Sequence, residues 1–136
     1  MKYSNQNNID KVLVASIIAV ESRYDNYAVS NKGAMGLMQI MPQTAIAFYD
    51  GENAHVDLYN PEQNVMIGIE FLSYLFEKYN DEITVLACYN AGENIVLKWM
   101  EGDKYLKMSK IKYVETYNYV KRVQRLKKIY KIRFLF

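Results

Sequence analysis

The sequence predicts an all-α protein built as one domain over residues 1–136. Apolar residues recur at steps of three and four along most of the chain, which is the spacing of one helix face. No window combines period-two alternation with glycine-flanked turns, so strands have little support. With 136 residues, 51% of them hydrophobic, the chain is long enough to bury a core without disulfides.

Helix start signals divide this apolar pattern into six segments. Asn8 is a candidate N-cap for the first, Pro42 suits the first position of the second, and Asp81 caps the fourth. The predicted spans are Ile9–Tyr24, Pro42–Tyr49, Pro61–Tyr79, Glu82–Tyr89, Glu93–Met100 and a final helix from about Lys112 onward. Residues 1–8 are expected to be a flexible lead, and residues 124–136 the basic end of the last helix.

The third segment is predicted to be a buried helix. Its start combines a capping side chain at Asn60, a proline at position 61 and an acidic residue at Glu62 that faces the helix dipole. Apolar residues then recur at helical spacing: Val65, Ile69, Leu72 and Phe76. A helix of this kind is expected at the centre of the domain.

Glu21 is the residue on which the functional interpretation depends. It follows a run of nine mostly apolar residues and lies at i+4 from Ile17, beside an apolar stripe formed with Leu13, Val20 and Tyr24. Desolvation there would disfavour the charged carboxylate and raise its pKa, as a general acid requires. The alternative is a solvated carboxylate at the helix end, paired with a nearby basic side chain.

The segment Ser30–Gln39 is predicted to be a tight loop. It contains two glycines three residues apart, Gly33 and Gly36, and ends in an apolar pair followed by an amide. Glycine allows the backbone to turn sharply or approach another group closely. We therefore expect this loop to bring its backbone and Gln39 close to a functional group.

Four short motifs follow one another along the chain. They are Glu21-Ser22, Ser-x-x-Gly-Ala-x-Gly-Leu-Met-Gln from Ser30 to Gln39, Tyr89-Asn90-Ala91-Gly92, and Glu115-Thr116-x-x-Tyr119-Val120. Over about Val12 to Val123 the chain resembles the soluble lytic transglycosylase family, whose members cleave peptidoglycan with a goose-type-lysozyme-like domain. The resemblance implies a single lysozyme-like helical domain with a central buried helix and a substrate groove.

The resemblance also implies a mechanism that needs one carboxyl group. Ordinary glycosidases use a pair of carboxyl groups, but the only other acid near Glu21 is Asp25, which we expect to be solvated or capping. In the resembled family one Glu protonates the leaving oxygen of the MurNAc–GlcNAc β-1,4 bond and the substrate's acetamido oxygen stabilises the cation. The same Glu then acts as a base for attack by the muramic 6-hydroxyl, which gives a 1,6-anhydro sugar. Glu21 matches this residue.

The first two motifs supply further residues by resemblance. Ser30 matches a polar contact that orients the sugar, and Gln39 would hold N-acetyl or hydroxyl groups. Met38 and Met41 would form soft apolar walls, although methionines at such positions also fill cores. Ser22 would support the catalytic residue.

The last two motifs supply the opposite side of the predicted cleft. Tyr89 and Asn90 match the pair that closes the cleft, with Asn90 contacting sugar, and Cys88 replaces the family's usual alanine as a buried hydrophobic residue. Tyr119 matches a phenol that hydrogen-bonds the catalytic carboxyl group. Glu115 is expected to brace its helix rather than to react.

Two alternative functions remain open at the sequence level. A hydrolytic muramidase on the same fold would use water in place of the 6-hydroxyl group. A catalytically silent wall-binding module of a secretion, conjugation or sporulation assembly would keep the fold without the reaction. The four intact motifs favour the lytic transglycosylase.

Composition limits the cofactors and partners. One cysteine and one histidine, Cys88 and His55, give poor support to a metal site, and we expect neither metal nor cofactor. His55 is expected in a loop or on the surface. Residues 1–103 carry a net charge of −8 and residues 104–136 carry +10, which we interpret as a basic helix face that balances an acidic remainder rather than as a nucleic-acid site.

The expected partners are therefore peptidoglycan glycan strands and possible cell-envelope assemblies. No segment reaches the roughly 18 consecutive apolar residues of a membrane span. The chain also lacks the pattern of an export signal. We expect a monomer that works outside the cytoplasm, at the cell wall, in the periplasm or as a secreted protein.

Overall fold

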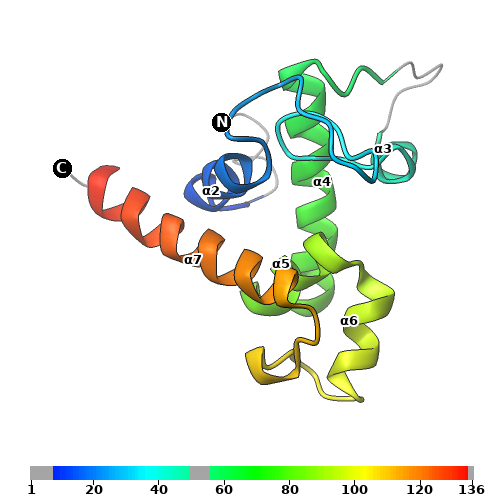
Figure 1. The fold of residues 1–136 in the computed structure, drawn as a ribbon, viewed down its shortest axis with the longest axis vertical. Helices are drawn as coiled ribbons and strands as arrows, with labels where there is room; N and C mark the ends of the chain where they lie inside the picture. Colours follow the sequence, from blue (N-terminus) through cyan, green and yellow to red (C-terminus); the bar gives the residue numbers. More distant parts are fainter. Residues whose placement is uncertain (1–7, 50–55, 135–136) are drawn as a thin grey trace. The chain divides into compact units, whose positions relative to one another are not determined.

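The computed structural model describes residues 8–49 and 56–134 (Figure 1). Backbone contacts divide the chain into two compact units, residues 1–71 and residues 72–136, and each is described by itself. The helices in chain order are α2 (Lys11–Ser22), α3 (Pro42–Phe48), α4 (Pro61–Tyr79), α5 (Glu82–Ala91), α6 (Glu93–Met100), the 3-10 turn η1 (Met108–Lys110) and α7 (Val114–Phe134).

The predicted all-α class is confirmed, and the described residues contain no β element beyond two isolated bridges. Helix α4 has the predicted bounds, because Asn60 caps it by accepting a hydrogen bond from the Gln63 N–H at 3.0 Å. Helix α6 also has its predicted bounds. Helix α5 continues two residues past its predicted end, to Ala91, and stops where Gly92 takes a positive φ of 97°.

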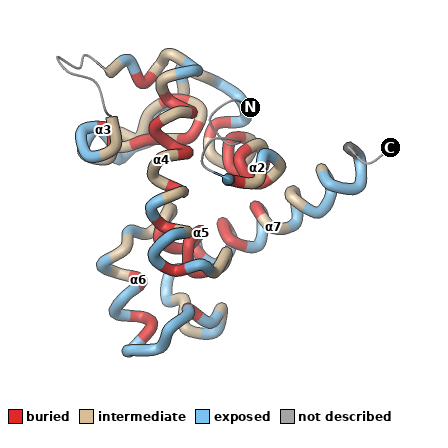
Figure 2. The backbone as a smooth tube through the Cα atoms, turned by 180° about the vertical axis from the view of Figure 1, so that it is seen from behind, coloured by how far each residue is buried: buried red, intermediate tan, exposed pale blue. Residues whose placement is uncertain are grey.

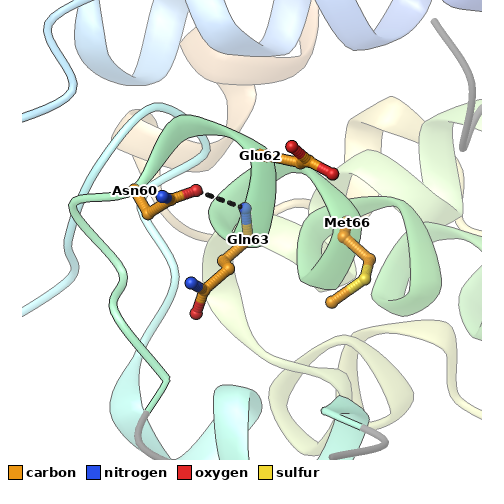
Figure 3. Close-up of a pocket in the computed structure, with 4 residues that line it drawn as sticks. All are labelled: Asn60, Glu62, Gln63 and Met66. Carbon is orange, nitrogen blue, oxygen red and sulfur yellow. Dashed lines mark hydrogen bonds between the residues drawn. The ribbon is translucent and has the colours of Figure 1, made fainter.

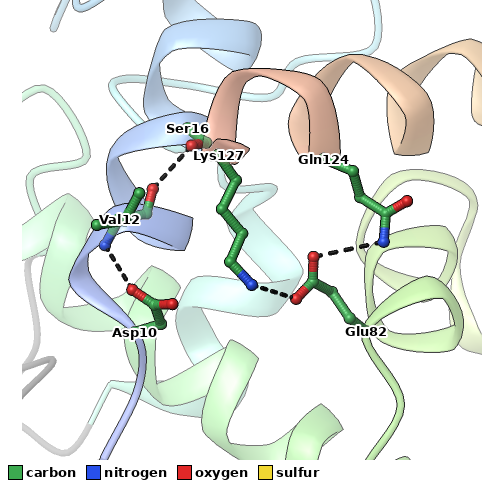
Figure 4. A network of polar contacts seen from close by, with 6 residues as sticks. All are labelled: Asp10, Val12, Ser16, Glu82, Gln124 and Lys127. Carbon is green, nitrogen blue, oxygen red and sulfur yellow. Dashed lines mark hydrogen bonds and ion pairs between the residues drawn. The ribbon is translucent and has the colours of Figure 1, made fainter. Parts of the chain in front are cut away.

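The first helix is shorter than predicted at both ends. Its N-cap is Asp10 rather than Asn8, because the Asp10 carboxylate accepts a hydrogen bond from the Val12 N–H at 2.8 Å (Figure 4). At the other end, Arg23 and Tyr24 have φ values of 53° and 63°, so the helix stops at Ser22. Tyr24 therefore lies outside the helix. The prediction that it extends the apolar stripe of this helix is wrong.

The first unit has a core made by α2, by α4 and by the chain between them. Leu13 and Ile17 of α2 are 1% and 0% exposed, and Ile67 and Ile69 of α4 have no exposed surface. The chain between α2 and α3 forms two antiparallel bridges, Val29 with Met35 and Met35 with Ile40. These bridges fold the predicted loop into a compact double turn.

Gly68 lets this double turn approach α4. A Cβ atom added at Gly68 would lie 2.3 Å from the Met38 sulfur and 3.2 Å from its Cβ atom. Met38 itself has no exposed surface. The closeness of the two residues thus depends on the missing side chain of Gly68, which the sequence pattern alone did not reveal.

The second unit is organised around α5, which packs against both α6 and α7. Val85 and Leu86 of α5 and Val120 and Val123 of α7 have no exposed surface. At the start of α5, the Glu82 carboxylate accepts hydrogen bonds from Lys127 at 2.6 Å and from Gln124 at 3.4 Å (Figure 4).

The C-terminal part of α7 is largely exposed (Figure 2). Ile129 and Ile132 are 45% and 62% exposed, and the basic side chains of Lys128 and Arg133 are exposed beside them. Predictions for residues 1–7 and for His55 fall outside the described residues.

We expect Gly68→Ala to lower the free energy of unfolding by about 1–3 kcal/mol, because the added methyl group overpacks the Met38 site. Met38→Ala alone should cost about 2–5 kcal/mol through the cavity it leaves. The double variant should cost clearly less than the sum, because the new methyl group enters the space vacated by Met38. Urea unfolding of the four proteins measures this coupling, and strict additivity would contradict the contact.

Candidate active site

Glu21 lies in the last turn of α2 and is half-buried. The neighbouring Ser22 is 7% exposed and donates a hydrogen bond from its hydroxyl group to the Ile18 carbonyl at 3.1 Å. Beyond the helix, the Tyr24 hydroxyl group donates to the Ala15 carbonyl at 3.0 Å. These contacts hold the end of the helix on both sides of Glu21.

Asp25 takes part in the turn after the helix. Its carboxylate accepts a hydrogen bond from the Tyr27 N–H at 2.9 Å, and the residue is exposed. This is the capping role predicted from the sequence. Asp25 therefore takes part in the structure of this turn.

Ser30 closes the first of the two turns in the second motif. Its hydroxyl oxygen accepts a hydrogen bond from the Ala34 N–H at 3.0 Å, and its carbonyl accepts one from Gly33 at 3.0 Å. Gly33 has a φ of 92°, a conformation that glycine adopts without steric cost. The Ser30 side chain is exposed, so it shapes the loop and still faces solvent.

Gln39 is held by its amide nitrogen. The Nε2 group donates to the Ala28 carbonyl at 3.0 Å and to the Gly36 carbonyl at 2.9 Å. The residue itself has a φ of 50°, which is uncommon for a non-glycine residue. Both N–H bonds of the amide are thereby used within the loop.

Asn64 of α4 is a site residue that the sequence analysis missed. It has no exposed surface, and its amide makes three hydrogen bonds. Nδ2 donates to the Met35 carbonyl at 2.8 Å and to the Leu58 carbonyl at 2.9 Å, while Oδ1 accepts from the Met38 N–H at 2.8 Å. A single buried amide thus fastens the second motif to α4.

Gly36 is required for this attachment. A Cβ atom at this position would lie 2.2 Å from the Leu58 carbonyl oxygen and 2.3 Å from Asn64 Nδ2. The sequence did carry a signal for the buried amide, since Asn64 interrupts the apolar pattern of a helix predicted to be buried. A polar residue on such a face needs hydrogen-bond partners.

The two methionines of the second motif differ in exposure. Met38 is fully buried, so here it fills the core, which is one of the two roles that the sequence allowed for it. Met41 is half-buried and is the residue that precedes Pro42 at the start of α3. Of the two, Met41 has side-chain surface that a ligand could contact.

The third and fourth motifs are joined by a hydrogen bond. The Thr116 hydroxyl group donates to Asn90 Oδ1 at 2.8 Å, and Thr116 is only 1% exposed. Tyr89 and Asn90 lie at the end of α5 and are half-buried. Contact between α5 and α7 therefore brings these two motifs together. The order of the motifs in the sequence could not show this.

Tyr119 and Glu115 occupy different environments on α7. Tyr119 is 5% exposed and its hydroxyl oxygen is buried. Glu115 lies in the first turn of α7 and is exposed, where an acidic side chain is favourable for the helix dipole. Its expected bracing role stays a prediction.

Glu93 holds the start of α6 against the end of α4. Its carboxylate accepts hydrogen bonds from the hydroxyl groups of Tyr74, at 2.9 Å, and Tyr79, and it pairs with Lys78 at 2.6 Å. Burial by itself raises the pKa of Glu93, but the hydrogen bonds from Lys78 and the two tyrosines outweigh it, so this pKa lies below its usual value. Burial and the Glu93 contact raise the pKa of the Tyr79 phenol. The third motif ends at Gly92, and the contacts of Glu93 therefore hold the chain immediately after this motif.

Cys88 is buried, as predicted, with 1% of its surface exposed. Burial and the nearby Glu93 carboxylate raise the pKa of its thiol to about 12. The thiol is therefore protonated near neutral pH and unsuited to act as a nucleophile.

Two pockets open near the start of α4 in the first unit. One has a volume of about 260 Å³ and is lined by Asn60, Glu62, Gln63 and Met66 (Figure 3). The other, of about 470 Å³, has mainly apolar walls: Met35, Pro42, Ala45, Ile46, Val56, Asp57, Leu58 and Tyr59. Neither has Glu21 in its walls.

The described parts of the chain hold neither a metal-binding cluster nor a membrane-spanning helix. Within residues 8–49 and 56–134, no three His, Cys, Asp or Glu side chains are grouped so that they could hold a metal ion. No helix in these ranges combines the length and apolar character that crossing a bilayer requires.

Comparison with known sequences gives a family match. The family described as "Transglycosylase SLT domain" matches residues 1–112. A membrane-bound lytic murein transglycosylase C from Actinobacillus pleuropneumoniae serotype 5b is 36% identical over 118 residues, which are 76% of this chain and 32% of that protein. A putative soluble lytic murein transglycosylase from Haemophilus influenzae is 35% identical over 131 residues, covering 85% of this chain and 21% of that protein.

Solved structures with the same fold are also found. The 70-kDa soluble lytic transglycosylase of Escherichia coli matches with a TM-score of 0.87 and 30% identity over 98% of this chain. An inactive mutant of the lytic transglycosylase Slt from Pseudomonas aeruginosa, with a glutamate replaced by glutamine, matches with a TM-score of 0.85 and 26% identity over 98% of this chain. Each match covers 23% of the longer protein, and the chain spans about a third of the length of the first curated relatives.

We expect Asn64→Ala to lower the free energy of unfolding by about 2–4 kcal/mol, because it leaves one buried N–H and two carbonyl groups without this partner. Gln63→Ala is the control, since Gln63 is half-buried and its side chain accepts one hydrogen bond, from the Asp57 N–H. It should cost about 1 kcal/mol or less. Chemical unfolding and amide hydrogen exchange at Met38 measure the effect, and equal losses in both variants would contradict the tether.

Removal of the Glu93 carboxylate should change the acid stability of the protein. Because the folded-state pKa of Glu93 lies below its usual 4.5, the folded protein binds fewer protons there than the unfolded chain, and the stabilisation is lost as the pH falls. Glu93→Gln should cost about 1–2 kcal/mol at pH 7. Its difference from wild type should shrink below about pH 4.5.

Unfolding free energies between pH 7 and about pH 3 test this expectation. Glu77→Gln, an exposed carboxyl group on α4, is the control. A difference between wild type and Glu93→Gln that stays constant across this range would show that the carboxylate does not carry the effect.

Proposed function

This chain belongs to the transglycosylase SLT domain family, and we propose that it is a peptidoglycan lytic transglycosylase. It would cleave the β-1,4 bond between MurNAc and GlcNAc and release a 1,6-anhydro-MurNAc end. The named relatives are membrane-bound or soluble lytic murein transglycosylases. The proposed catalytic domain is the whole of residues 1–136, and the proposed place of action is the cell wall outside the cytoplasm.

The single observation that carries the proposal is the position of Glu21. It is a half-buried carboxyl group in the last turn of α2, at a position that matches the family's first motif, and its helix end is held by contacts of Ser22 and Tyr24. The nearby acid Asp25 is exposed and engaged in a turn. This favours a mechanism with one carboxyl group over a mechanism with a pair.

The proposed reaction uses Glu21 twice. As an acid it donates a proton to the glycosidic oxygen, which leaves with the departing sugar. The substrate's own acetamido oxygen stabilises the positive charge at the anomeric carbon. As a base Glu21 then removes the proton of the muramic 6-hydroxyl group, whose oxygen forms the new bond to that carbon, so no water is consumed.

The remaining motif residues have proposed roles in binding. Ser30, Gln39, Met41, Tyr89 and Asn90 would each contact the sugar. These binding roles are supported by burial, because each of the five residues is exposed or only half-buried. Tyr119 would support the catalytic carboxyl group through its phenol.

We expect Glu21→Gln to lower the rate of peptidoglycan cleavage by at least about 100-fold, because glutamine cannot donate or remove the proton. The Slt mutant from Pseudomonas aeruginosa, which is inactive with glutamine in place of a glutamate, supports this expectation. Asp25→Asn is the matched control and should keep near-normal activity. Folding of both variants is checked by circular dichroism and thermal unfolding.

Mass spectrometry of digested peptidoglycan identifies the reaction. Anhydro-muropeptides, lighter by one water than the products of hydrolysis, support the proposal. Reducing ends would instead identify a hydrolytic muramidase. Binding to peptidoglycan without any soluble product would identify a silent wall-binding module, and full activity of Glu21→Gln would refute the catalytic assignment.

A further inference from the structure

We infer that the two amides predicted to contact sugar are locked with opposite polarity, and that Thr116 is a positioning residue that acts through Asn90. Asn90 presents its N–H donors to a ligand, whereas Gln39 presents only its carbonyl acceptor. This inference rests on the proposed function for the identity of the ligand, a glycan rich in acetamido and hydroxyl groups. The locking itself depends only on contacts within each unit.

The polarity of Gln39 follows from its two acceptors. A side-chain amide has two N–H donors on nitrogen and acceptor capacity on oxygen. The Ala28 and Gly36 carbonyls can only accept, so the group that faces them must be the nitrogen. Within the part of the chain that the structure describes, the Oε1 atom of Gln39 makes no hydrogen bond. A ligand group that reaches this amide must therefore donate an O–H or N–H.

In the structure the Asn90 amide turns its oxygen toward the Thr116 hydroxyl group. This hydroxyl is buried and donates to Asn90 Oδ1 at 2.8 Å. The amide oxygen of Asn90 therefore faces α7, and the amide nitrogen is the part that remains available to a ligand. Among the described residues, no hydrogen bond is made by Asn90 Nδ2. A ligand group that reaches this amide must accept, as a carbonyl or a hydroxyl oxygen does.

Each amide specifies the class of ligand group that can bond to it. The acceptor at Gln39 suits the N–H of an acetamido group, and the donors at Asn90 suit the carbonyl of such a group. A polyanion such as nucleic acid would find only acceptors at Gln39, where its phosphate oxygens cannot bond. A misoriented amide would offer the wrong group and leave a polar atom unpaired on binding, which is costly.

The lock can be measured first in the free protein by side-chain amide hydrogen exchange in NMR spectra. The Gln39 NH₂ hydrogens should be protected, because both are bonded to carbonyl groups. The Asn90 NH₂ hydrogens should exchange rapidly with solvent. The reverse pattern would overturn the inference, and this result does not depend on whether the protein cleaves peptidoglycan.

The role of Thr116 is tested with a pair of substitutions. Thr116→Val keeps the side-chain shape but removes the hydroxyl group, so the Asn90 amide is free to turn. Binding of a soluble tetramer of β-1,4-linked N-acetylglucosamine should weaken about threefold to tenfold, the loss expected from one neutral hydrogen bond. Thr116→Ser restores the donor and should recover wild-type binding.

Thr84→Val is the matched control in the same unit. Thr84 is also fully buried, and its hydroxyl group donates to Asp81 at 2.6 Å and accepts from the Leu106 N–H at 2.9 Å, at no predicted sugar contact. This variant should lower the melting temperature but leave the dissociation constant of the tetramer unchanged. Equal weakening by Thr116→Val and Thr84→Val, or no recovery in Thr116→Ser, would overturn the positioning role. If the wild type does not bind the tetramer, the proposed substrate class fails, while amide exchange still decides the lock.

Discussion

The buried amide of Asn64 is the interaction on which the first unit depends. One side chain bonds the Met35 and Leu58 carbonyls and the Met38 N–H. Without it the buried Leu58 carbonyl and Met38 N–H would lose this partner at a cost, whereas the Met35 carbonyl would keep its bond from the Ile40 N–H. The second motif is a double turn that has backbone hydrogen bonds of its own. Asn64 fastens this double turn to α4, and Gly36 provides the space for the contact.

The second unit fixes its motif in a related way. Glu93 follows directly after the third motif and gathers hydrogen bonds from Tyr74 and Tyr79 together with the Lys78 ammonium group. Helix α4 therefore carries a tether for a motif in each unit, Asn64 near its start and the tyrosines near its end. Rigid elements are the usual means of holding binding residues that lie on loops and helix ends.

The four motifs could be recognised in the sequence because they are local. Glu21, Gln39 and Asn90 stand in short segments whose spacing identifies the family, and the family match agrees with that prediction. Asn64 and Gly68 were not identified, since their importance comes from contacts with residues about thirty positions earlier in the chain. The orientation of an amide depends on its partners in space, and so the sequence could not give it.

The sequence by itself determined the helical class, the bounds of α4 and α6, and the motifs that identify the family, because helical periodicity, capping side chains and motifs act over a few neighbouring positions. Tertiary structure decided which cap starts α2 and which methionine is buried. It also decided which atoms of Gln39 and Asn90 remain available to a ligand. These properties depend on groups brought together from distant parts of the chain, and hydrogen-bond satisfaction in a buried setting selects among alternatives that are equal at the level of local sequence.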